Sequence, residues 1–413
     1  MPSLTLLLES GVLVAAVLWA GLSIYVLAVQ RRRDAAQATL DTAMAALREP
    51  TVRALPLADR MARVQPLLED ASRELVMRAV ADDRTPPDAA AALEGYLIDR
   101  WGKDTLEQDA SSHRTTRDKW RRITALQILF RFGHARRIEL GAQAVHEPDA
   151  DVASMALSLL GGSDHPDAVA VLLDALKRRQ HPGSRIAVHL ERSPQRLGER
   201  LRPLLADADP VVRRWAATLL GRYPDVDGLE GDLAVAARDP DPRVRKAAVQ
   251  SLGQTGDQLA ASTAVFLLDD PVPFVRAAAV RAIGALERDD LAEDVAARLG
   301  DRDWWVRFAA KECLESMGPD IWPMLVRLLD DPDRFVRNSA AEVFQNIGVL
   351  DSFIVMEAAT ADPTDQKVEL LRRVAAAGGL RLTDSLLERA GTRLSARVRH
   401  LLSAIGLEHV GAA

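Results

Sequence analysis

The stretch DPDPRVRKAAVQSLG, Asp239–Gly253, recurs along this chain in the same register. Its Val-Arg pair returns at steps of 32, 31, 31 and 30 residues, as Val212-Arg213, Val244-Arg245, Val275-Arg276, Val306-Arg307 and Val336-Arg337. A period near 31 residues is typical of stacked two-helix units, because each unit buries its apolar face only against a like neighbour. The repeat therefore predicts an all-α solenoid and not a single globular core.

Each copy has the pattern of an amphipathic helix. Counted from the valine, apolar or small residues fall at positions 0, +4 and +8, which share one face of an α-helix. Position +4 is alanine in every copy, at Ala216, Ala248, Ala279, Ala310 and Ala340. A methyl group lets a neighbouring helix approach closely, so we expect these alanines to form the contact between repeats.

Aspartate and proline mark where each helix begins. Asp241 can cap the first free backbone N–H groups, and Pro242 suits the first helical turn. The same role is expected for Asp209, Asp303 and Asp333. Apolar runs between the copies predict the second, outer helix of each pair, at Leu259–Leu268, Leu291–Leu299 and Ile321–Leu329. One unit is thus a helix, a tight turn and a second helix.

Weaker copies extend the series in both directions. They fall within Trp120–Gly133, Val152–Gly161, Ser184–Leu190, Val368–Ala377 and Val398–Gly406. Together they predict about ten two-helix repeats over residues 119–406, with irregular copies at the ends and a tail at 407–413.

The repeated pattern resembles HEAT repeats, in particular the short bacterial type named for phycobilisome lyase-like HEAT proteins, whose consensus is D-x-D-x-x-V-R-x-x-A-x-x-A-L-G. The resemblance covers Trp120 to Gly406 and is strongest over Asp207–Gly348, where five consecutive copies agree. It implies a HEAT-like α-solenoid and, because this family serves mostly as an interaction scaffold, a protein partner. Bilin lyases of the same type are the enzymatic alternative that the resemblance implies.

The N-terminal region carries a second pattern. Gly11–Val29 has no charged side chain, and the apolar residues from Leu4 lengthen it enough to span a hydrocarbon core of about 30 Å as a helix. A cleaved signal peptide is the alternative, but no Lys or Arg precedes the apolar stretch. Because Arg31–Arg33 follow it, the positive-inside rule places the repeats in the cytoplasm. We therefore expect residues 4–30 to anchor the chain in the lipid bilayer of a bacterial inner membrane, as a single-pass protein with its N-terminus outside.

Residues 31–118 are expected to form a juxtamembrane helical region that ends in a polar loop. Asp34–Arg48, Leu57–Ala81 and Asp88–Arg100 are rich in helix-forming residues, and prolines separate them. Trp101–Trp120 is polar and its middle has no apolar period, which indicates a loop.

The sequence contains no recognisable catalytic constellation, cofactor motif or metal site. His146-Glu147 is one copy of a dipeptide that di-iron hydroxylases with HEAT repeats carry several times, and one copy cannot build that site. The single cysteine, Cys313, allows no internal disulfide. A formal net charge of −6 argues against a nucleic-acid partner. We therefore expect a non-catalytic protein without a cofactor.

The arginine that follows each valine has two interpretations. Each can hydrogen-bond to an aspartate or a carbonyl of the adjacent turn and tie repeats together, or the series can line a groove that grips an acidic partner. Regularity favours the first, because a structural role must recur in every unit while a binding site need not. Arg276, Arg307 and Arg337 are nevertheless kept as candidate partner-binding residues.

Residues that depart from the repeat are better candidates for a site. An aromatic residue precedes the valine in three successive copies, at Phe274, Trp305 and Phe335, and Trp304 precedes Trp305. If exposed, these rings form a binding ridge; if buried, they pack between turns. We take these four aromatic residues, with the three arginines, as the candidate partner-binding residues.

The sequence thus predicts a membrane-anchored cytoplasmic scaffold that binds a protein partner, such as a membrane glycosyltransferase or another envelope protein, in envelope or polysaccharide assembly. Two alternatives stay open. One is a bilin-lyase-like enzyme, and the other is a lipid- or nucleic-acid-binding module, which would carry a continuous basic stripe.

Overall fold

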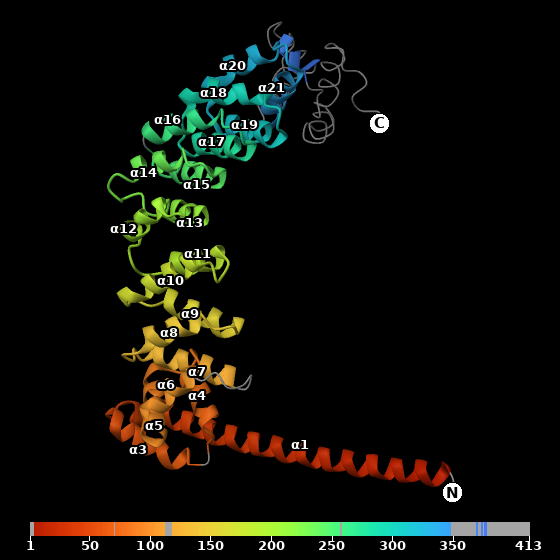
Figure 1. Ribbon diagram of the computed structural model, residues 1–413, viewed down its shortest axis with the longest axis vertical. Coiled ribbons are helices and arrows are strands. Elements are labelled where there is room, and N and C mark those ends of the chain that lie inside the picture. Colours follow the sequence, from red (N-terminus) through yellow and green to blue (C-terminus); the bar gives the residue numbers. More distant parts are fainter. Residues whose placement is uncertain are drawn as a thin grey trace, which may run out of the picture. The chain divides into compact units, whose positions relative to one another are not determined.

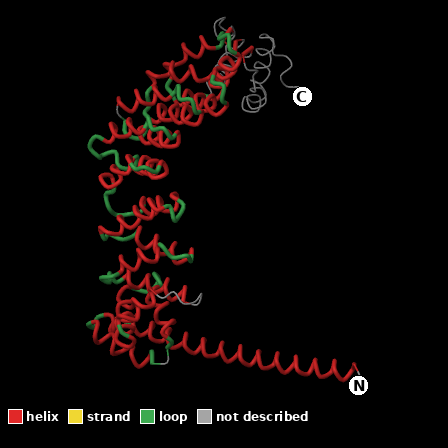
Figure 2. The backbone as a smooth tube through the Cα atoms, in the orientation of Figure 1, coloured by secondary structure: helices red, strands yellow, loops and turns green. Residues whose placement is uncertain are grey.

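The computed structural model describes residues 4–69, 71–111, 118–256 and 258–347, together with 369, 370, 373, 374, 376 and 377. Every regular element in these ranges is a helix, as Figures 1 and 2 show, so the all-α prediction is confirmed. The chain divides into two compact units, Met1–Gln195 and Arg196–Ala413.

The first unit contains α1 Leu4–Arg48, α2 Pro50–Arg53, α3 Leu57–Val64, η1 Gln65–Leu67, α4 Arg73–Ala81, α5 Pro87–Trp101, α6 Lys103–Ser111, α7 Asp118–Arg131, α8 Arg137–Val145, α9 Ala150–Gly161, α10 Pro166–Arg178 and α11 Gly183–Glu191. The second contains α12 Gly198–Leu201, η2 Arg202–Ala206, α13 Pro210–Leu220, α14 Leu229–Ala236, α15 Pro242–Leu252, α16 Gln258–Leu267, α17 Pro273–Ala285, η3 Asp289–Leu291, α18 Ala292–Ala296, η4 Ala297–Gly300, α19 Trp304–Ser316, η5 Pro319–Ile321, α20 Trp322–Leu328 and α21 Arg334–Asn346.

The prediction of a transmembrane anchor is wrong. The apolar stretch is not a helix of its own, because α1 runs for 45 residues and passes without a break from that stretch into Arg31–Arg33. Within the residues that the structure describes, no helix is both long enough and apolar enough to cross a bilayer. The single-pass inner-membrane location, with the N-terminus outside and the solenoid in the cytoplasm, is therefore wrong as well. The bilayer contact expected through residues 4–30 has no support.

The C-terminal part of α1 belongs to the core of the first unit. Leu40, Ala43 and Leu47 are buried, and α1 contacts α3 and α4. Farther along this unit, α9 packs beside α7 and α8. It is the weaker repeat copy expected at Val152–Gly161, and Val152, Ala156 and Leu160 are fully buried as the pattern predicts.

The polar loop expected over Trp101–Trp120 is wrong for part of its length. Lys103–Ser111 forms α6, and its two apolar residues, Leu106 and Ala110, are both buried. They lie four residues apart and so on one helical face, which is enough to fix a short helix to its neighbours although the rest of the segment is polar. Residues 112–117 lie outside the described residues.

The second unit stacks the predicted two-helix repeats. Its inner helices are α13, α15, α17, α19 and α21, and the alanine at position +4 of each is fully buried. Consecutive inner helices come close: a Cβ added at Gly284 of α17 would lie 3.1 Å from Cys313 Sγ of α19. Likewise, Ser251 Oγ on α15 donates a buried 2.7 Å hydrogen bond to the Ala217 carbonyl of α13. Small residues therefore make the inter-repeat contact, as the sequence predicted.

The predicted outer helices are also present, as α16, as α18 with its flanking η3 and η4, and as α20 with η5. One hydrophobic core runs through the inner and outer helices from α15 to α21 and reaches Val374 and Ala377. The copy at Val398–Gly406, the tail 407–413 and most of Val368–Ala377 lie outside the described residues. The number of about ten repeats and the boundary of the solenoid at 406 therefore stay predictions.

Candidate functional site

The turns that precede the inner helices are built by two aspartates. At the start of α19, Asp301 Oδ1 accepts a hydrogen bond of 2.8 Å from the Asp303 backbone N–H, and Asp303 Oδ1 accepts one of 2.9 Å from the Trp305 backbone N–H. The second contact caps α19, as predicted, and the same cap forms at Asp209, Asp241 and Asp333. The turn therefore holds its first aspartate in a fixed position at the edge of the repeat.

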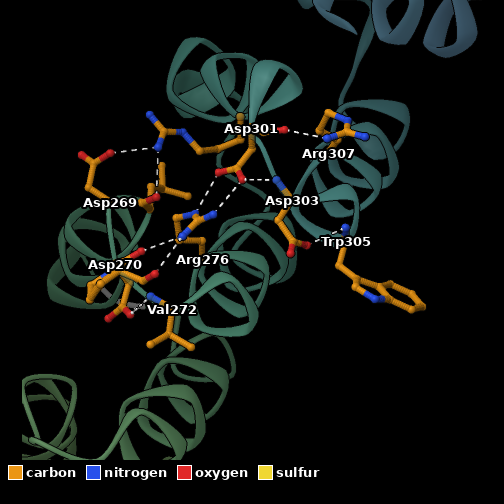
Figure 3. Close-up of polar contacts among 11 residues, drawn as sticks. Asp269, Asp270, Val272, Arg276, Asp301, Asp303, Trp305 and Arg307 are labelled. Atoms are coloured by element: carbon orange, nitrogen blue, oxygen red, sulfur yellow. Dashed lines mark hydrogen bonds and ion pairs between the residues drawn. The ribbon is translucent and has the colours of Figure 1, made fainter.

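An arginine from the preceding repeat reaches that first aspartate. Arg276 Nε and Nη2 donate to the two carboxylate oxygens of Asp301 at 2.8 and 2.7 Å, as Figure 3 shows. Its Nη1 donates to the Asp270 carbonyl of its own turn at 2.9 Å. Arg276 is 5 % exposed, so this forked ion pair ties two successive turns together inside the protein.

Two further pairs repeat this geometry. Arg245 holds both oxygens of Asp270 at 2.7 and 2.9 Å, and Arg213 holds both oxygens of Asp239 at 2.7 and 2.9 Å. We call the pairs Arg213–Asp239, Arg245–Asp270 and Arg276–Asp301 the closed rungs. They match the structural interpretation of the arginine series.

The closed rungs shift the acidity of their carboxylates. Burial alone would raise the pKa of Asp301, but the hydrogen bonds from the Arg276 guanidinium and from the Asp303 backbone N–H outweigh it and hold the pKa below its ordinary value. Asp239 behaves in the same way: burial raises its pKa, and the hydrogen bonds from Arg213 and from the Asp241 N–H lower it further than that. Both carboxylates are therefore charged in the folded protein at neutral pH.

The next arginine in the series breaks the pattern. Arg307 Nη1 donates to the Asp301 carbonyl at 2.7 Å, as in the closed rungs, but no carboxylate among the described residues pairs with its Nε and Nη2. The guanidinium lies over the ring of Phe335, 4.7 Å from the ring centre. Asp331 keeps the usual turn contact, since its Oδ1 accepts from the Asp333 N–H at 2.8 Å. We call Arg307 the open rung.

Exposed aromatic side chains surround the open rung. Trp304 stacks on Phe308 with ring centres 5.3 Å apart, and Trp305 meets Trp304 edge to face at 4.6 Å. Trp305 is 61 % exposed and Phe335 is 41 % exposed. In Figure 3 the indole of Trp305 points away from the closed rung. The aromatic–arginine patch, as we call this surface at the beginnings of α19 and α21, consists of Trp304, Trp305, Phe308, Phe335, Arg307 and Arg334.

The structure separates the predicted site residues into groups. Trp304, Trp305, Phe335 and Arg307 lie together in the patch. Phe274 is exposed at the start of α17, one repeat earlier, whereas Arg276 is buried in a closed rung. Arg337 donates through Nη1 to the Asp331 and Pro332 carbonyls at 2.6 and 2.9 Å, and the aspartate expected one repeat later lies outside the described residues.

Sequence reasoning left two patch residues out. Arg334 lies over the Phe335 ring at 4.9 Å, and Phe308 stacks on Trp304. The signal for Phe308 was its distance of four residues from Trp304, which places both rings on one helical face. The signal for the open rung was the shortened last step of the repeat. The separation from the arginine to the turn aspartate is 26, 25 and 25 residues in the closed rungs but 24 from Arg307 to Asp331.

The part of the chain that the structure describes contains no cluster of three or more His, Cys, Asp or Glu side chains that could hold a metal ion. Cys313 is buried, and burial raises the pKa of its thiol to about 11. Such a thiol is protonated at neutral pH and is a poor nucleophile.

The family model for HEAT repeats matches this chain at residues 198–284, 263–345 and 292–378. Residues 198–378 are HEAT repeats. No curated protein matches the sequence. Among solved structures, the complex of CpcE and CpcF of phycocyanin lyase from Nostoc sp. PCC7120 is similar at 20 % identity over 65 % of this chain and 94 % of that one, with a TM-score of 0.28.

Two other solved structures are similar in the same way. Human deoxyhypusine hydroxylase in complex with glycerol is 20 % identical over 62 % of this chain and 99 % of that one, with a TM-score of 0.26. Kap121p bound to Pho4p is 13 % identical over 91 % of this chain and 48 % of that one, with a TM-score of 0.46. At these identities and TM-scores, the similarities say nothing about what this chain binds or catalyses.

Proposed function

We propose that this protein is a non-catalytic HEAT-repeat scaffold that binds a protein partner through the aromatic–arginine patch. The observation that carries the proposal is the coincidence of exposed Trp304, Trp305 and Phe335 with the open rung at Arg307. Tryptophan and arginine are the side chains most enriched at the centres of protein interfaces, because they combine a large contact area with directed hydrogen bonds.

The position of the patch also supports docking. Its rings and guanidinium groups are mounted on the first turns of two helices whose following turns are buried in one core, at Val306, Ala310 and Ala340. Groups held on packed helices lose little conformational freedom on binding, which favours affinity. The earlier link to envelope assembly and to a glycosyltransferase depended on the membrane anchor, and it is not part of this proposal.

The test is chemical crosslinking and co-purification with the full-length protein. One variant combines W304A and W305A. The matched control is F266A, because Phe266 on α16 is also an exposed phenylalanine with an arginine over its ring, Arg238, at 5.1 Å. We expect a partner to co-purify with the natural protein and with F266A, and to be lost with the double variant.

Circular dichroism and thermal unfolding establish that all three proteins keep their helices. If the same proteins co-purify with the double variant, or if none co-purifies at all, the proposed docking function is wrong.

A further inference from the structure

We infer that the patch recognises an acidic segment of its partner, and that a partner aspartate or glutamate completes the open rung at Arg307. This inference rests on the proposed docking function and adds the chemistry of the partner. The closed rungs supply the argument, because they show which group this arginine position binds when one is within reach.

The donors of Arg307 are arranged for a carboxylate. In each closed rung, Nη1 is bound to a carbonyl of the arginine's own turn, and Nε with Nη2 grips both oxygens of an aspartate at 2.7 to 2.9 Å. Arg307 makes the first contact, to the Asp301 carbonyl, but has no described carboxylate for the second. The guanidinium is therefore fixed at one end while its remaining fork lacks the acceptor that its equivalents have.

Phe335 holds the open rung ready without blocking it. A guanidinium that lies over an aromatic ring uses its flat face for that contact, whereas its N–H groups point outward in its own plane. The position of Arg307 over Phe335 thus restrains the side chain and leaves the in-plane fork of Nε and Nη2 available. A two-oxygen acceptor, such as a carboxylate, matches this fork.

The nearby acids of this chain do not take that place. Asp331 Oδ1 accepts from the Asp333 N–H, and Asp333 Oδ1 accepts from the Phe335 N–H, both as in the other repeats. Unlike Asp301, Asp331 does not also pair with the preceding arginine, and its separation from that arginine is one residue shorter than in the nearest closed rungs. The shorter turn leaves the carboxylate position of this rung to a group from outside.

Charge and apolar surface together define the occupant. Two further arginines, Arg302 and Arg334, are exposed beside the patch, and neither forms an ion pair with a described carboxylate. Trp304 and Trp305 offer apolar surface next to them. The matching ligand is an extended protein segment that carries aspartate or glutamate next to a large apolar side chain.

The experiment selects peptides from a random library displayed on phage, with the full-length protein as bait. Selected peptides are then synthesised with a fluorescent label, and their affinity is measured for the natural protein, R307A, R307K, W305A and the control F266A. A second version of each peptide carries asparagine and glutamine in place of its acids.

We expect the selected peptides to combine acidic and large apolar residues and to bind F266A as they bind the natural protein. R307A and the amide peptides should each bind about tenfold or more weakly, since a charge-assisted fork is lost. R307K should bind more weakly than the natural protein, because an ammonium group keeps the charge but not the fork.

Two contrary outcomes have different meanings. Peptides that lose affinity on W305A, yet lack acids or ignore R307A, overturn the acidic-segment inference and leave the docking function standing. Peptides whose binding is unaffected by both W305A and R307A, or a failure to select any peptide, overturn the inference together with the proposed patch.

Discussion

Arg276 and Arg307 occupy the same position in consecutive repeats of the second unit, but they serve different surroundings. Arg276 is buried and holds both oxygens of Asp301, while Arg307 lies over the exposed ring of Phe335 without a described carboxylate. Both keep the contact to the carbonyl of their own turn. The local geometry of the arginine is therefore a property of the repeat, and the identity of its carboxylate partner depends on the length of the next turn.

The comparison shows how one repeated residue can carry both stability and recognition. A buried, forked ion pair between turns resists separation of two repeats, since removing either member leaves a buried charge without its partner. The same arginine with its fork open to solvent costs little to leave unpaired, and it offers a fixed donor pair to another molecule. The predictions below test this difference.

The largest effect is expected for R276M. Methionine fills part of the buried space but leaves the Asp301 carboxylate without its guanidinium, and breaking a buried pair in this way costs about 3–5 kcal/mol. Unfolding by urea, followed by circular dichroism, measures the loss. A loss below about 1 kcal/mol for R276M would mean that the closed rung does not hold the repeats together.

The double variant R276M with D301L is its control. It removes both charges and replaces them with apolar groups, so it should recover a large part of the stability that R276M loses. If the double variant is no more stable than R276M, the loss comes from packing around Arg276 and not from the unpaired aspartate.

The sequence contained most of the information about the fold. The periodic valine, alanine and large apolar residue predicted the inner helices, because a buried position in a stacked repeat must be filled in the same way each time. The turn aspartates were predictable as caps for the same reason. The pattern failed where two apolar residues sufficed for a helix, at Leu106 and Ala110 of α6. It also failed at the N-terminus, where an uncharged stretch proved to be part of a longer helix.

The candidate site was predictable only in part. Trp304, Trp305 and Phe335 stood out as departures from the repeat, but their exposure depends on where the turn places them, and no spacing rule fixes that. The pairing of each arginine with the aspartate of the next turn required coordinates, since the two residues are 25 or 26 positions apart. For that reason the sequence could not separate Arg276 from Arg307, although the step of 30 residues between Val306 and Val336 marked the difference.

The second effect concerns the buried thiol of Cys313, which lies between α17 and α19 beside Gly284. With its pKa raised to about 11 by burial, it should react with a thiol reagent only when the two helices separate. R276M ties these repeats less firmly, so labelling of the folded protein should be at least about tenfold faster than in the natural chain. The rate is measured by mass spectrometry, with R307A as the control that should match the natural rate. Equal rates in R276M and the natural protein would contradict the role assigned to the closed rung.

The third effect is a difference in acid stability. The pKa values of Asp239 and Asp301 are lower in the folded protein than in the unfolded chain, so the stability they contribute is fully present above the unfolded value of about 3.9. That contribution is lost as the pH falls below this value and through the folded pKa values. The free energy of unfolding should therefore decline below about pH 4, and the decline should be shallower in D301N, which cannot titrate at this position. Parallel curves for D301N and the natural protein would show that the Asp301 carboxylate contributes nothing to acid stability.

The smallest effect is expected for the stability of R307A. The variant loses one hydrogen bond to the Asp301 carbonyl and a partly exposed contact with the Phe335 ring, and contacts of this kind contribute about 0.5–1 kcal/mol each. No buried carboxylate is stranded, because none of the described carboxylates pairs with Arg307. The urea midpoint of R307A should therefore lie close to that of the natural protein even though the acidic peptides no longer bind it. A loss as large as that of R276M would mean that the rung is closed by a carboxylate of this chain in solution, and the distinction between the two arginines would then disappear.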